Sequence, residues 1–416
     1  MTSRERIQAA LEHRTPDRTP RDFGSSAVTG ISASFIFKLR RALGLAEKPI
    51  PIFCPYQMLG EIDEDLRAAL RVDAIPIWPS GNLFGFENTP VKPFTMNDGT
   101  PVLVPEAFNT NYEPDGRLYQ YACGDRNYPP SGVMPKGGFY FDATVRAKPV
   151  DDELPLDPAD NLEEFPLIDE EALRSAEREA KELYENTGYA IVSGGPGGTG
   201  LGDIAFVPGT MLRDPKGVRD IEDWYMSPLI RPEYIKEIFD LQTDIALENL
   251  KLYHQAVGDR VSVITLCGTD FGNQRSLMLS TEVFREIYLP YYKKMTGWIH
   301  ENTKWKVFKH CCGAIEPMLP YLIEAGFDII NPVQISAAGM DSEVLKRKYG
   351  DKLTFWGGGV RTQSTLPFGT PDEVREEVKN QVRTLGVNGG FVFNTIHNVQ
   401  ANVPVENFLA MIEALG

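Results

Sequence analysis

Short apolar runs recur along the chain, and segments with apolar side chains at helical spacing separate most of them. The runs are rich in β-branched and aromatic residues, as strands buried on both faces are. They are centred near Arg21, Ile75, Ile191, Ile264, Val307, Ile329, Phe355 and Val392. Repeated alternation of strand and helix is typical of a closed parallel barrel. The pattern therefore predicts an α/β fold, a (β/α)₈ TIM barrel, formed as a single domain by residues 1–416.

Residues 79–166 interrupt this alternation after the second predicted strand. Turn sequences such as Asn97–Gly99 and Pro114–Gly116 separate short aromatic runs there, which is the pattern of β-hairpins. An acidic, proline-rich segment from Val150 to Asp160 has the composition of a linker. We therefore predict a hairpin-rich insertion within the barrel.

The carboxyl ends of the strands form the face at which TIM barrels carry their chemistry. The residues at or just after the predicted strand ends are Asp22, Trp78, Ser193, Asp270, His310, Cys312, Asn331, Gln334, Trp356, His397 and Asn398. We expect these residues to meet at one end of the barrel. Four of them are candidates for binding a substrate: Asn331, Gln334, Trp356 and Asn398.

The stretch Trp305–Gly313 carries the clearest chemical signal. It begins as a β-branched and aromatic run and ends in His310, Cys311 and Cys312. Because side chains alternate between the faces of a strand, His310 and Cys312 point the same way, whereas Cys311 points into packing. An imidazole and a thiolate that converge form half of a zinc site. His397, at the end of the last predicted strand, is the candidate third ligand, and three ligands with an open fourth position are typical of catalytic zinc.

Other residues near these strand ends have two interpretations each. Cys267, at the end of the fourth predicted strand, is either an alternative ligand or a small buried thiol. Asp270 lies in a glycine-containing turn, where it either bonds its own backbone or orients a substrate and handles a proton. Glu316 is interpreted as a cap of the following helix. The glycine runs Gly194–Gly198 and Gly357–Gly359 match neither a P-loop nor the dinucleotide fingerprint, so nucleotide binding is not supported.

Composition excludes several classes of function. Of the 416 residues, 42% are hydrophobic and 24% charged, as in ordinary globular proteins. The formal net charge of −16 disfavours nucleic acid and anionic membranes, which both attract basic protein surfaces. No apolar run reaches the roughly 18 residues of a membrane-spanning helix, and the first residues lack the apolar segment of a signal peptide. The five cysteines do not suggest a disulfide framework, so we expect a cytoplasmic protein with reduced thiols.

Eight stretches of the chain together resemble the uroporphyrinogen decarboxylase superfamily. They are Gly268–Gln274, Ser280–Glu286, Leu289–Lys293, Lys309–Gly313, Trp356–Val360, Leu366–Pro371, His397–Gln400 and Val403–Asn407. The resemblance covers most of the chain and is strongest from about Val261 to the end. It points to the branch of zinc- and corrinoid-dependent methyltransferases, and it implies a TIM barrel, in agreement with the strand count.

The chain departs from the superfamily at two places. The decarboxylases proper carry an Arg-Gln-Ala-Gly-Arg motif for substrate carboxylates near the N-terminus, and the equivalent region Arg18–Gly24 lacks it. The methyltransferases hold zinc through His-x-Cys and a later Cys. His310 and Cys312 match the first two ligands, and His397 stands in the place of the third. A histidine in place of a thiolate leaves zinc more Lewis-acidic, which favours polarising an ether oxygen over methylating a thiol.

The resemblance therefore implies a zinc-dependent methyltransferase that moves a methyl group between a corrinoid protein and a small molecule. The reaction would be demethylation of a methyl ether or amine, or methylation of a thiol. Zn²⁺ would be held by His310, Cys312 and His397, and Asp270 would orient the substrate or supply a proton. Two alternatives stay open: a metal-free decarboxylase acting on a tetrapyrrole or smaller acid, and a non-catalytic protein that binds a corrinoid or tetrapyrrole.

Overall fold

The computed structural model of the chain describes residues 1–151, 153 and 155–416, and of Cys267 it describes the backbone alone. The two residues left out belong to the predicted linker from Val150 to Asp160, so that prediction lies partly outside the described residues.

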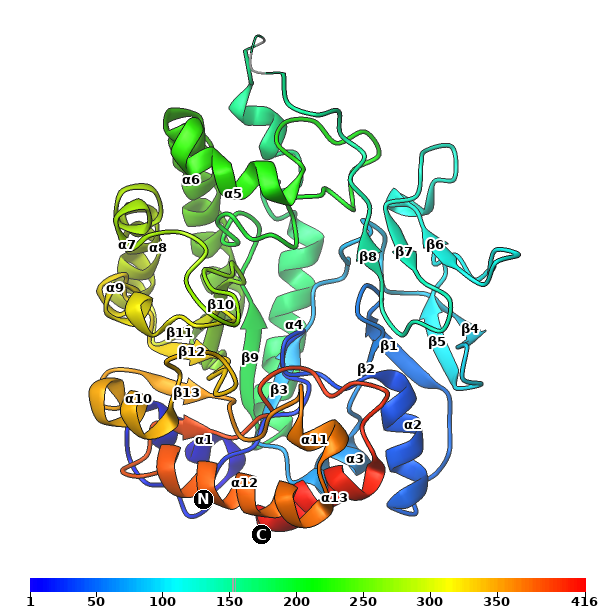
Figure 1. Cartoon of the computed structure of the whole chain (residues 1–416), viewed down its shortest axis with the longest axis vertical. Coiled ribbons are helices and arrows are strands. Elements are labelled where there is room, and N and C mark those ends of the chain that lie inside the picture. Colours follow the sequence, from blue (N-terminus) through cyan, green and yellow to red (C-terminus); the bar gives the residue numbers. More distant parts are fainter. Residues whose placement is uncertain (152, 154) are drawn as a thin grey trace.

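A curled sheet of parallel strands forms the centre of the molecule (Figure 1). Its strands are β3 (Ala74–Ile77), β9 (Ala190–Gly194), β10 (Val263–Cys267), β11 (Lys306–His310), β12 (Ile329–Asn331), β13 (Thr354–Trp356) and β14 (Phe391–Val392). They pair in the order β14-β13-β12-β11-β10-β9-β3, so strands that follow one another along the chain are neighbours. Helices connect consecutive strands, which confirms the predicted α/β class and gives a TIM-barrel-like architecture.

The prediction of a regular strand near Arg21 is wrong. The segment lies between β14 and β3 but forms only an isolated parallel bridge of Arg21 with Phe393. The N–H of Asp22 donates to the Phe393 carbonyl at 2.9 Å, and on the other side the N–H of Asp73 donates to the Arg21 carbonyl at 2.7 Å. Pro20 has no N–H, and the N–H of Arg21 donates to the carboxylate of Asp73 at 2.8 Å, so neither residue extends a ladder.

Apolar side chains fill the inside of the curled sheet. This buried cluster consists of Ala74, Ala190, Val192, Val263, Phe308, Ile329, Trp356 and Val392, together with Ile7, Ala10 and Leu11 of α1 (Ser3–Leu11). α1 contacts β3, β9 and β14, and it closes the amino-terminal end of the sheet. The carboxyl end is thereby left for the polar residues at the ends of the strands.

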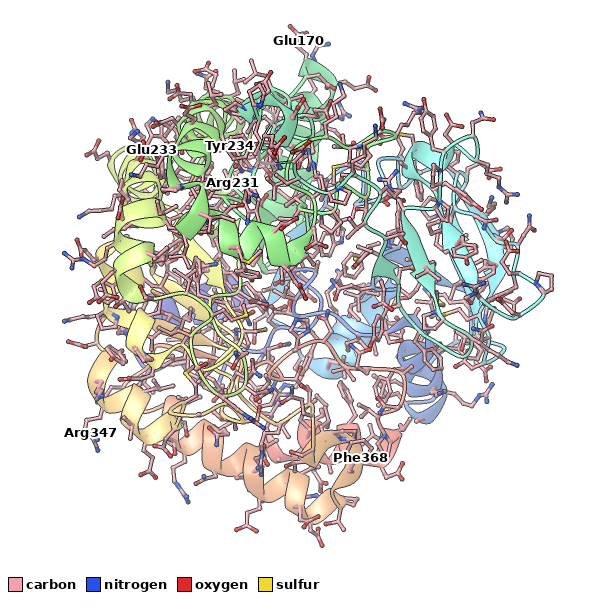
Figure 2. All side chains as sticks on the ribbon, turned by 45° about the horizontal axis from the view of Figure 1, so that its top comes forward. Glu170, Arg231, Glu233, Tyr234, Arg347 and Phe368 are labelled. Carbon is pink, nitrogen blue, oxygen red and sulfur yellow. The ribbon has the colours of Figure 1, made fainter. Side chains whose placement is uncertain are left out.

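The remaining helices pack around the sheet and the loops at its carboxyl end (Figure 1). They are α2 (Ala33–Ala42), α3 (Glu64–Leu70), α4 (Glu170–Asn186), α5 (Ile221–Ile230), α6 (Pro232–Val257), α7 (Thr281–Val283), α8 (Leu289–Asn302), α9 (Leu319–Glu324), α10 (Ser342–Tyr349), α11 (Thr365–Phe368), α12 (Pro371–Leu385) and α13 (Val405–Ala414). Their outer faces carry charged side chains such as Glu170, Glu233 and Arg347 (Figure 2). None of the helices in the described part of the chain is both long and apolar enough to cross a membrane.

Two further sheets lie beside the parallel one, on the right in Figure 1. Their strands are β1 (Ile50–Cys54), β2 (Leu59–Gly60), β4 (Val91–Thr95), β5 (Pro101–Pro105), β6 (Leu118–Gln120), β7 (Gly132–Met134) and β8 (Asp142–Ala143). β4 to β8 fall in the region predicted to hold hairpins, whereas the sequence pattern does not predict β1 and β2. Because β1 pairs with β5, part of the hairpin region shares a sheet with residues that precede β3. An insertion bounded by residues 79 and 166 stays a prediction.

Candidate metal centre

The side chains of His310, Cys312 and His397 converge at the carboxyl end of the parallel sheet. His310 is the last residue of β11, and His397 lies in the loop after β14. One ligand atom from each residue lies within 4.8 Å of the other two, and the two imidazole rings are 5.4 Å apart, edge to face. Among the described residues, no other group of three His, Cys, Asp or Glu side chains comes this close.

The donor set fits a zinc ion. Ligand distances of about 2.0–2.3 Å place two tetrahedral ligands about 3.5 Å from each other. His310 Nε2 and Cys312 Sγ are already 3.4 Å apart. Burial lowers the pKa of His310 and of His397 to about 4, so both rings are neutral at pH 7, the form that binds a metal. Burial raises the pKa of the Cys312 thiol, so the sulfur keeps its proton unless a cation displaces it.

Asn331 holds the ring of His310 in the orientation that a metal ligand needs. The register of β11 and β12 pairs these two residues, and His310 Nδ1 donates to Asn331 Oδ1 at 2.6 Å. Asn331 Nδ2 donates in turn to the carbonyl of Trp356 at 2.8 Å, so the amide is fixed at both ends. With its proton on Nδ1, His310 presents an unprotonated Nε2 to Cys312.

We expect Asn331→Leu to weaken zinc binding by about 10–100-fold, because loss of a residue that orients a ligand histidine has effects of this size. Competition against a chelator of known affinity measures the change. Asn331→Asp keeps the acceptor oxygen and should retain more of the affinity. Asn407→Leu is the matched control, since Asn407 is also buried but donates to the carbonyls of Leu366 and Gly369. Wild-type affinity in Asn331→Leu would contradict the orienting role.

Asp270 lies against the loop that carries Cys312. Its Oδ1 accepts the N–H of Cys312 at 2.6 Å, and its own carbonyl accepts the hydroxyl of Tyr225 at 2.7 Å. Burial raises the pKa of the Asp270 carboxyl, and the Cys312 N–H, Lys309 and His397 oppose this rise. A half-buried carboxyl beside the ligand set is placed to orient a substrate or to exchange a proton with it.

Tyr225 and Lys309 are neighbours of the site that the sequence does not predict. Tyr225 is on α5, whose Pro228 argues against a helix when only the sequence is considered. Lys309 is fully buried, and its Nζ donates to the carbonyls of Thr269 and His310, both at 2.7 Å. The sequence could have indicated Lys309 through its position in an apolar strand, because a buried charged side chain needs hydrogen-bond partners.

The predicted substrate-binding side chains make contacts within the protein. Both ends of the Asn331 amide are bonded as described above. Gln334 Oε1 accepts the N–H of Gly313 at 2.7 Å. Trp356 is fully buried, and its Nε1 donates to Asp22 Oδ2 at 2.9 Å. In this arrangement the three side chains shape the loops around the ligand set, and a substrate role for them stays a prediction.

Asn398, the fourth of these candidates, joins His397 to an early part of the chain. Its backbone N–H donates to His397 Nδ1 at 2.8 Å, its Oδ1 accepts the N–H of Gly30 at 2.7 Å, and its Nδ2 donates to Gln57 Oε1 at 2.7 Å. Because Nδ1 of His397 is an acceptor, the neutral ring carries its proton on Nε2. Binding of a metal to His397 must therefore either remove the proton from Nε2 or break the hydrogen bond that Nδ1 accepts from Asn398. A substrate role for Asn398 also stays a prediction.

The sequence also places Cys311, Cys267 and Glu316 near the site. Cys311 is fully buried, and its Sγ accepts a backbone N–H of the loop after β10, so it packs away from the ligands as the strand alternation predicts. The side chain of Cys267 lies outside the described residues, and its role as an alternative ligand stays a prediction. The interpretation of Glu316 as a helix cap is wrong. Its carboxylate accepts Lys348 Nζ at 2.7 Å and the Tyr349 hydroxyl at 2.8 Å, because both side chains of α10 reach it.

The fold and the site together define a class of protein, with a TIM-barrel-like α/β fold and a His/Cys/His ligand set at the carboxyl ends of its strands. The sequence model of the family described as uroporphyrinogen decarboxylase (URO-D) matches residues 208–416, half of the chain. The chain belongs to the uroporphyrinogen decarboxylase family.

Comparisons with other proteins add information on the fold. The chain is similar to the structure of a methyltransferase from Methanosarcina mazei, with 15% identity, coverage of 100% of this chain and 98% of that chain, and a TM-score of 0.54. A GH113 β-1,4-mannanase shares 12% identity over 57% of this chain and 70% of that chain, with a TM-score of 0.25. A search of curated proteins gave no match. The first likeness supports the fold alone.

Proposed function

We propose that the protein is a zinc-dependent methyltransferase that moves a methyl group between a corrinoid protein and a small substrate. The observation that carries this proposal is the convergence of His310, Cys312 and His397. Three ligands leave a fourth tetrahedral position for a substrate atom, as in catalytic zinc sites. Membership of the family and the similarity in fold to a protein that is itself a methyltransferase support the choice of reaction.

The residues around the site would have separate roles in binding the metal and the substrate. When bound, zinc would lower the pKa of a substrate thiol or polarise the oxygen or nitrogen that releases a methyl group. His310, Cys312 and His397 would hold the ion, and Asn331 keeps His310 turned toward it. Asp270, whose pKa is raised by burial, would orient the substrate or take and return its proton. One thiolate and two neutral imidazoles would leave the ion more Lewis-acidic than two thiolates would, which suits polarising the heteroatom of a neutral ether or amine.

The corrinoid would arrive on a partner protein at the carboxyl end of the sheet. Cys312 and His397 are half-buried, so this end of the molecule gives access to the ligand set. The proposal includes a complete (β/α)₈ barrel, in which the segment at Arg21 occupies the eighth position. Hydrogen bonds from this segment toward β14 and toward Asp73, the residue before β3, support that closure.

The decarboxylase alternative has less support. A substrate with several carboxylates needs arginine side chains that face it. Arg18 instead pairs with Asp73 at 2.7 Å, and Arg21 donates to the carbonyl of Leu415 at 2.9 Å. Both contacts lie toward the amino-terminal end of the sheet. The arginines in the region that carries the decarboxylase motif elsewhere in the family are therefore bound to the protein itself.

Metal analysis and methyl-transfer assays on the purified chain test the proposal. We expect about one zinc ion per chain, demethylation of a methyl ether or amine with cob(I)alamin as acceptor, or methylation of a thiol by methylcobalamin. Turnover of uroporphyrinogen by the zinc-free protein would establish the decarboxylase instead. A coloured corrinoid complex without turnover, unchanged by chelation, would establish a non-catalytic binding protein.

A further inference from the structure

A buried lysine lies directly behind the ligand set. Lys309 precedes His310 at the end of β11, and its side chain is fully buried. Because side chains alternate between the faces of a strand, Lys309 points away from the face that carries His310. A lysine is seldom fully buried, since removing its charge from water is costly unless other groups compensate for the loss. The contacts of Lys309 show which groups do so.

Lys309 joins the end of β11 to the loop after β10. Its Nζ donates to the carbonyl of Thr269 and to the carbonyl of His310, both at 2.7 Å. The same Nζ lies 5.1 Å from the centre of the Phe271 ring, within the range of a cation–π interaction. The lysine therefore contacts the residues on both sides of Asp270.

Two further hydrogen bonds connect the same loop and strand end. Asp270 Oδ1 accepts the N–H of Cys312 at 2.6 Å, and the N–H of Phe271 donates to Cys311 Sγ at 3.2 Å. Lys309 contributes an ionised donor to this set, and hydrogen bonds from an ionised donor are about twice as strong as neutral ones. The lysine is therefore a major part of the connection between Asp270 and the strand that carries the ligands.

Two carboxyl groups lie close enough to offset the charge of Lys309. Burial raises the pKa of Asp203 and of Asp270, and the positive charge of Lys309 opposes that rise in both. Asp203 Oδ2 also accepts the N–H of Gly268 at 2.9 Å, two residues before Asp270 in the same loop. Carbonyl groups and acids thus surround the ammonium group, and they fix its position.

We propose that Lys309 is a positioning residue that sets the distance between Asp270 and the metal ligands. Its Nζ holds the carbonyls of Thr269 and His310, so the loop with Asp270 moves relative to β11 only if one of these bonds breaks. The inference rests on the proposed function, in which Asp270 acts on a substrate at the ligand set. Lys309 is fully buried, so it acts through Asp270 and not on the substrate.

Amide hydrogen exchange of the purified full chain tests this geometry without an activity assay. The reporter is the N–H of Cys312, which Asp270 accepts. Lys309→Met keeps the length of the side chain but removes the charge and the donors. We expect it to speed exchange of this amide about tenfold, the scale of losing one hydrogen bond. Lys309→Gln keeps an N–H donor, should shift the rate in the same direction, and replaces Lys309→Met if that variant does not fold.

Lys306→Met is the matched control for the exchange measurement. Lys306 lies on the same strand, but it is half-buried and pairs with Asp328 at 3.1 Å. Loss of such a partly exposed ion pair has a small effect, so exchange at Cys312 should stay within about twofold of the wild type.

The kinetic test is a double-variant cycle with Asp270. Lys309→Met should lower kcat for methyl transfer by about 10–100-fold, the scale of moving a reacting group by about 1 Å, with KM and zinc content unchanged. In the Asp270→Asn background, Lys309→Met should cost no more than about a further twofold, because it acts through a group that is already lost. Absence of methyl transfer in the wild type would contradict the proposed function, whereas the exchange rates would still decide the role of Lys309.

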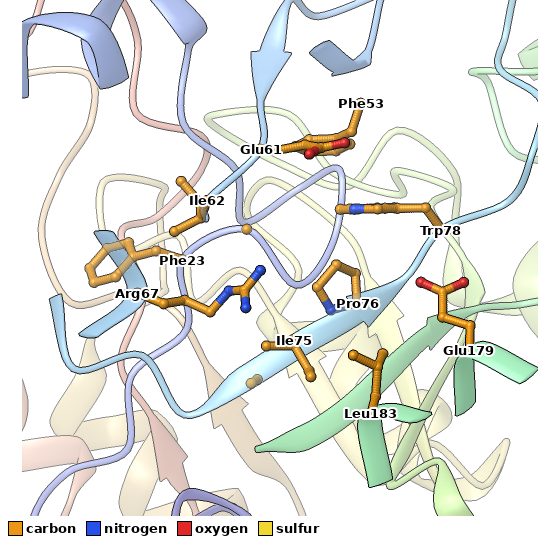
Figure 3. A pocket seen from close by; sticks show the side chains of 12 residues that line it. Phe23, Phe53, Glu61, Ile62, Arg67, Ile75, Pro76, Trp78, Glu179 and Leu183 are labelled. Carbon is orange, nitrogen blue, oxygen red and sulfur yellow. The ribbon is translucent and has the colours of Figure 1, made fainter. Parts of the chain in front are cut away.

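A cavity of about 220 Å³ between β3, α3 and α4 provides a control for general loss of stability (Figure 3). Its lining residues include neither Lys309 nor Asp270, and none of them is a candidate metal ligand. Leu183→Ala enlarges this cavity and should lower the Tm. Exchange at Cys312 and kcat should stay within about twofold of the wild type, because distant sites act independently.

Three results would overturn the proposal. The first is unchanged exchange of the Cys312 amide in both Lys309 variants. The second is an equal loss of kcat from Lys309→Met in the wild-type and Asp270→Asn backgrounds, which would show that the lysine acts independently of Asp270. The third is an effect of Leu183→Ala on exchange and kcat as large as that of Lys309→Met, which would reduce the role of the lysine to general stability.

Discussion

Cys312→Ser is expected to yield a folded protein with less than about a tenth of the wild-type zinc content and methyl transfer slowed at least about a thousandfold. The physical reason is the small size of the ligand set, because two imidazoles without the thiolate hold zinc weakly. His310→Ala and His397→Ala should give the same result. Because the three residues act as one unit, a double variant should be hardly worse than a single one. Metal content per chain and the initial rate of methyl transfer are the two measurements.

Cys311→Ser is the matched control for this prediction. Cys311 is the same residue type at the adjacent position, but it is fully buried and accepts the N–H of Phe271 at 3.2 Å instead of joining the ligand set. Its zinc content and methyl transfer should stay within about twofold of the wild type, with some loss of Tm. Stoichiometric zinc in Cys312→Ser, or equal loss of zinc in both serine variants, would contradict the assignment of Cys312 as a ligand.

Asp270→Asn is expected to lower kcat for methyl transfer by about 10²–10⁴-fold while zinc stays bound, the range typical of losing a group that handles a proton. Asparagine has nearly the same size as aspartate, and its oxygen can still accept the N–H of Cys312 that Asp270 accepts at 2.6 Å. The loop that carries Cys312 should therefore keep its place. What the variant loses is the negative charge and the ability to take a proton. Zinc analysis and separate determination of kcat and KM check both parts.

Tyr225→Phe distinguishes chemistry from positioning at Asp270. The Tyr225 hydroxyl donates to the Asp270 carbonyl at 2.7 Å, so the phenylalanine variant loosens the loop and leaves the carboxylate unchanged. We expect a loss of kcat of no more than about tenfold, the scale of one neutral hydrogen bond. If Tyr225→Phe were as slow as Asp270→Asn, the role of Asp270 would be to position the loop rather than to handle a proton.

Much of the fold follows from local sequence patterns. β11 ends at His310 and β13 at Trp356, as the apolar runs predict, because strands buried on both faces must be apolar wherever they lie in a sheet. α10 (Ser342–Tyr349) and α12 (Pro371–Leu385) also follow from local signals, because each begins directly after a capping residue, Asp341 and Thr370. The strand at Arg21 fails for the opposite reason. The N–H of Arg21 bonds to the carboxylate of Asp73, a distant partner that no local pattern reveals.

The candidate site divides in the same way. His310 and Cys312 share a face and Cys311 does not, because side chains alternate between the two faces of a strand. The sequence alone supports this prediction. The orienting role of Asn331 depends on the register of two neighbouring strands, and that of Tyr225 depends on where α5 lies. Side-chain roles that arise from register or from helix placement cannot be read from spacing along one segment.

The sequence by itself therefore determined the class of fold, the facing of His310 and Cys312, and the resemblance to a family that the chain proves to belong to. Only the tertiary structure decided that His397 reaches those two residues within ligand distance and that Asn331 and Tyr225 lie beside the ligand set. The physical reason is that periodicity and capping act over a few residues, whereas these distances depend on how far the parallel sheet curls and how the helices pack on it.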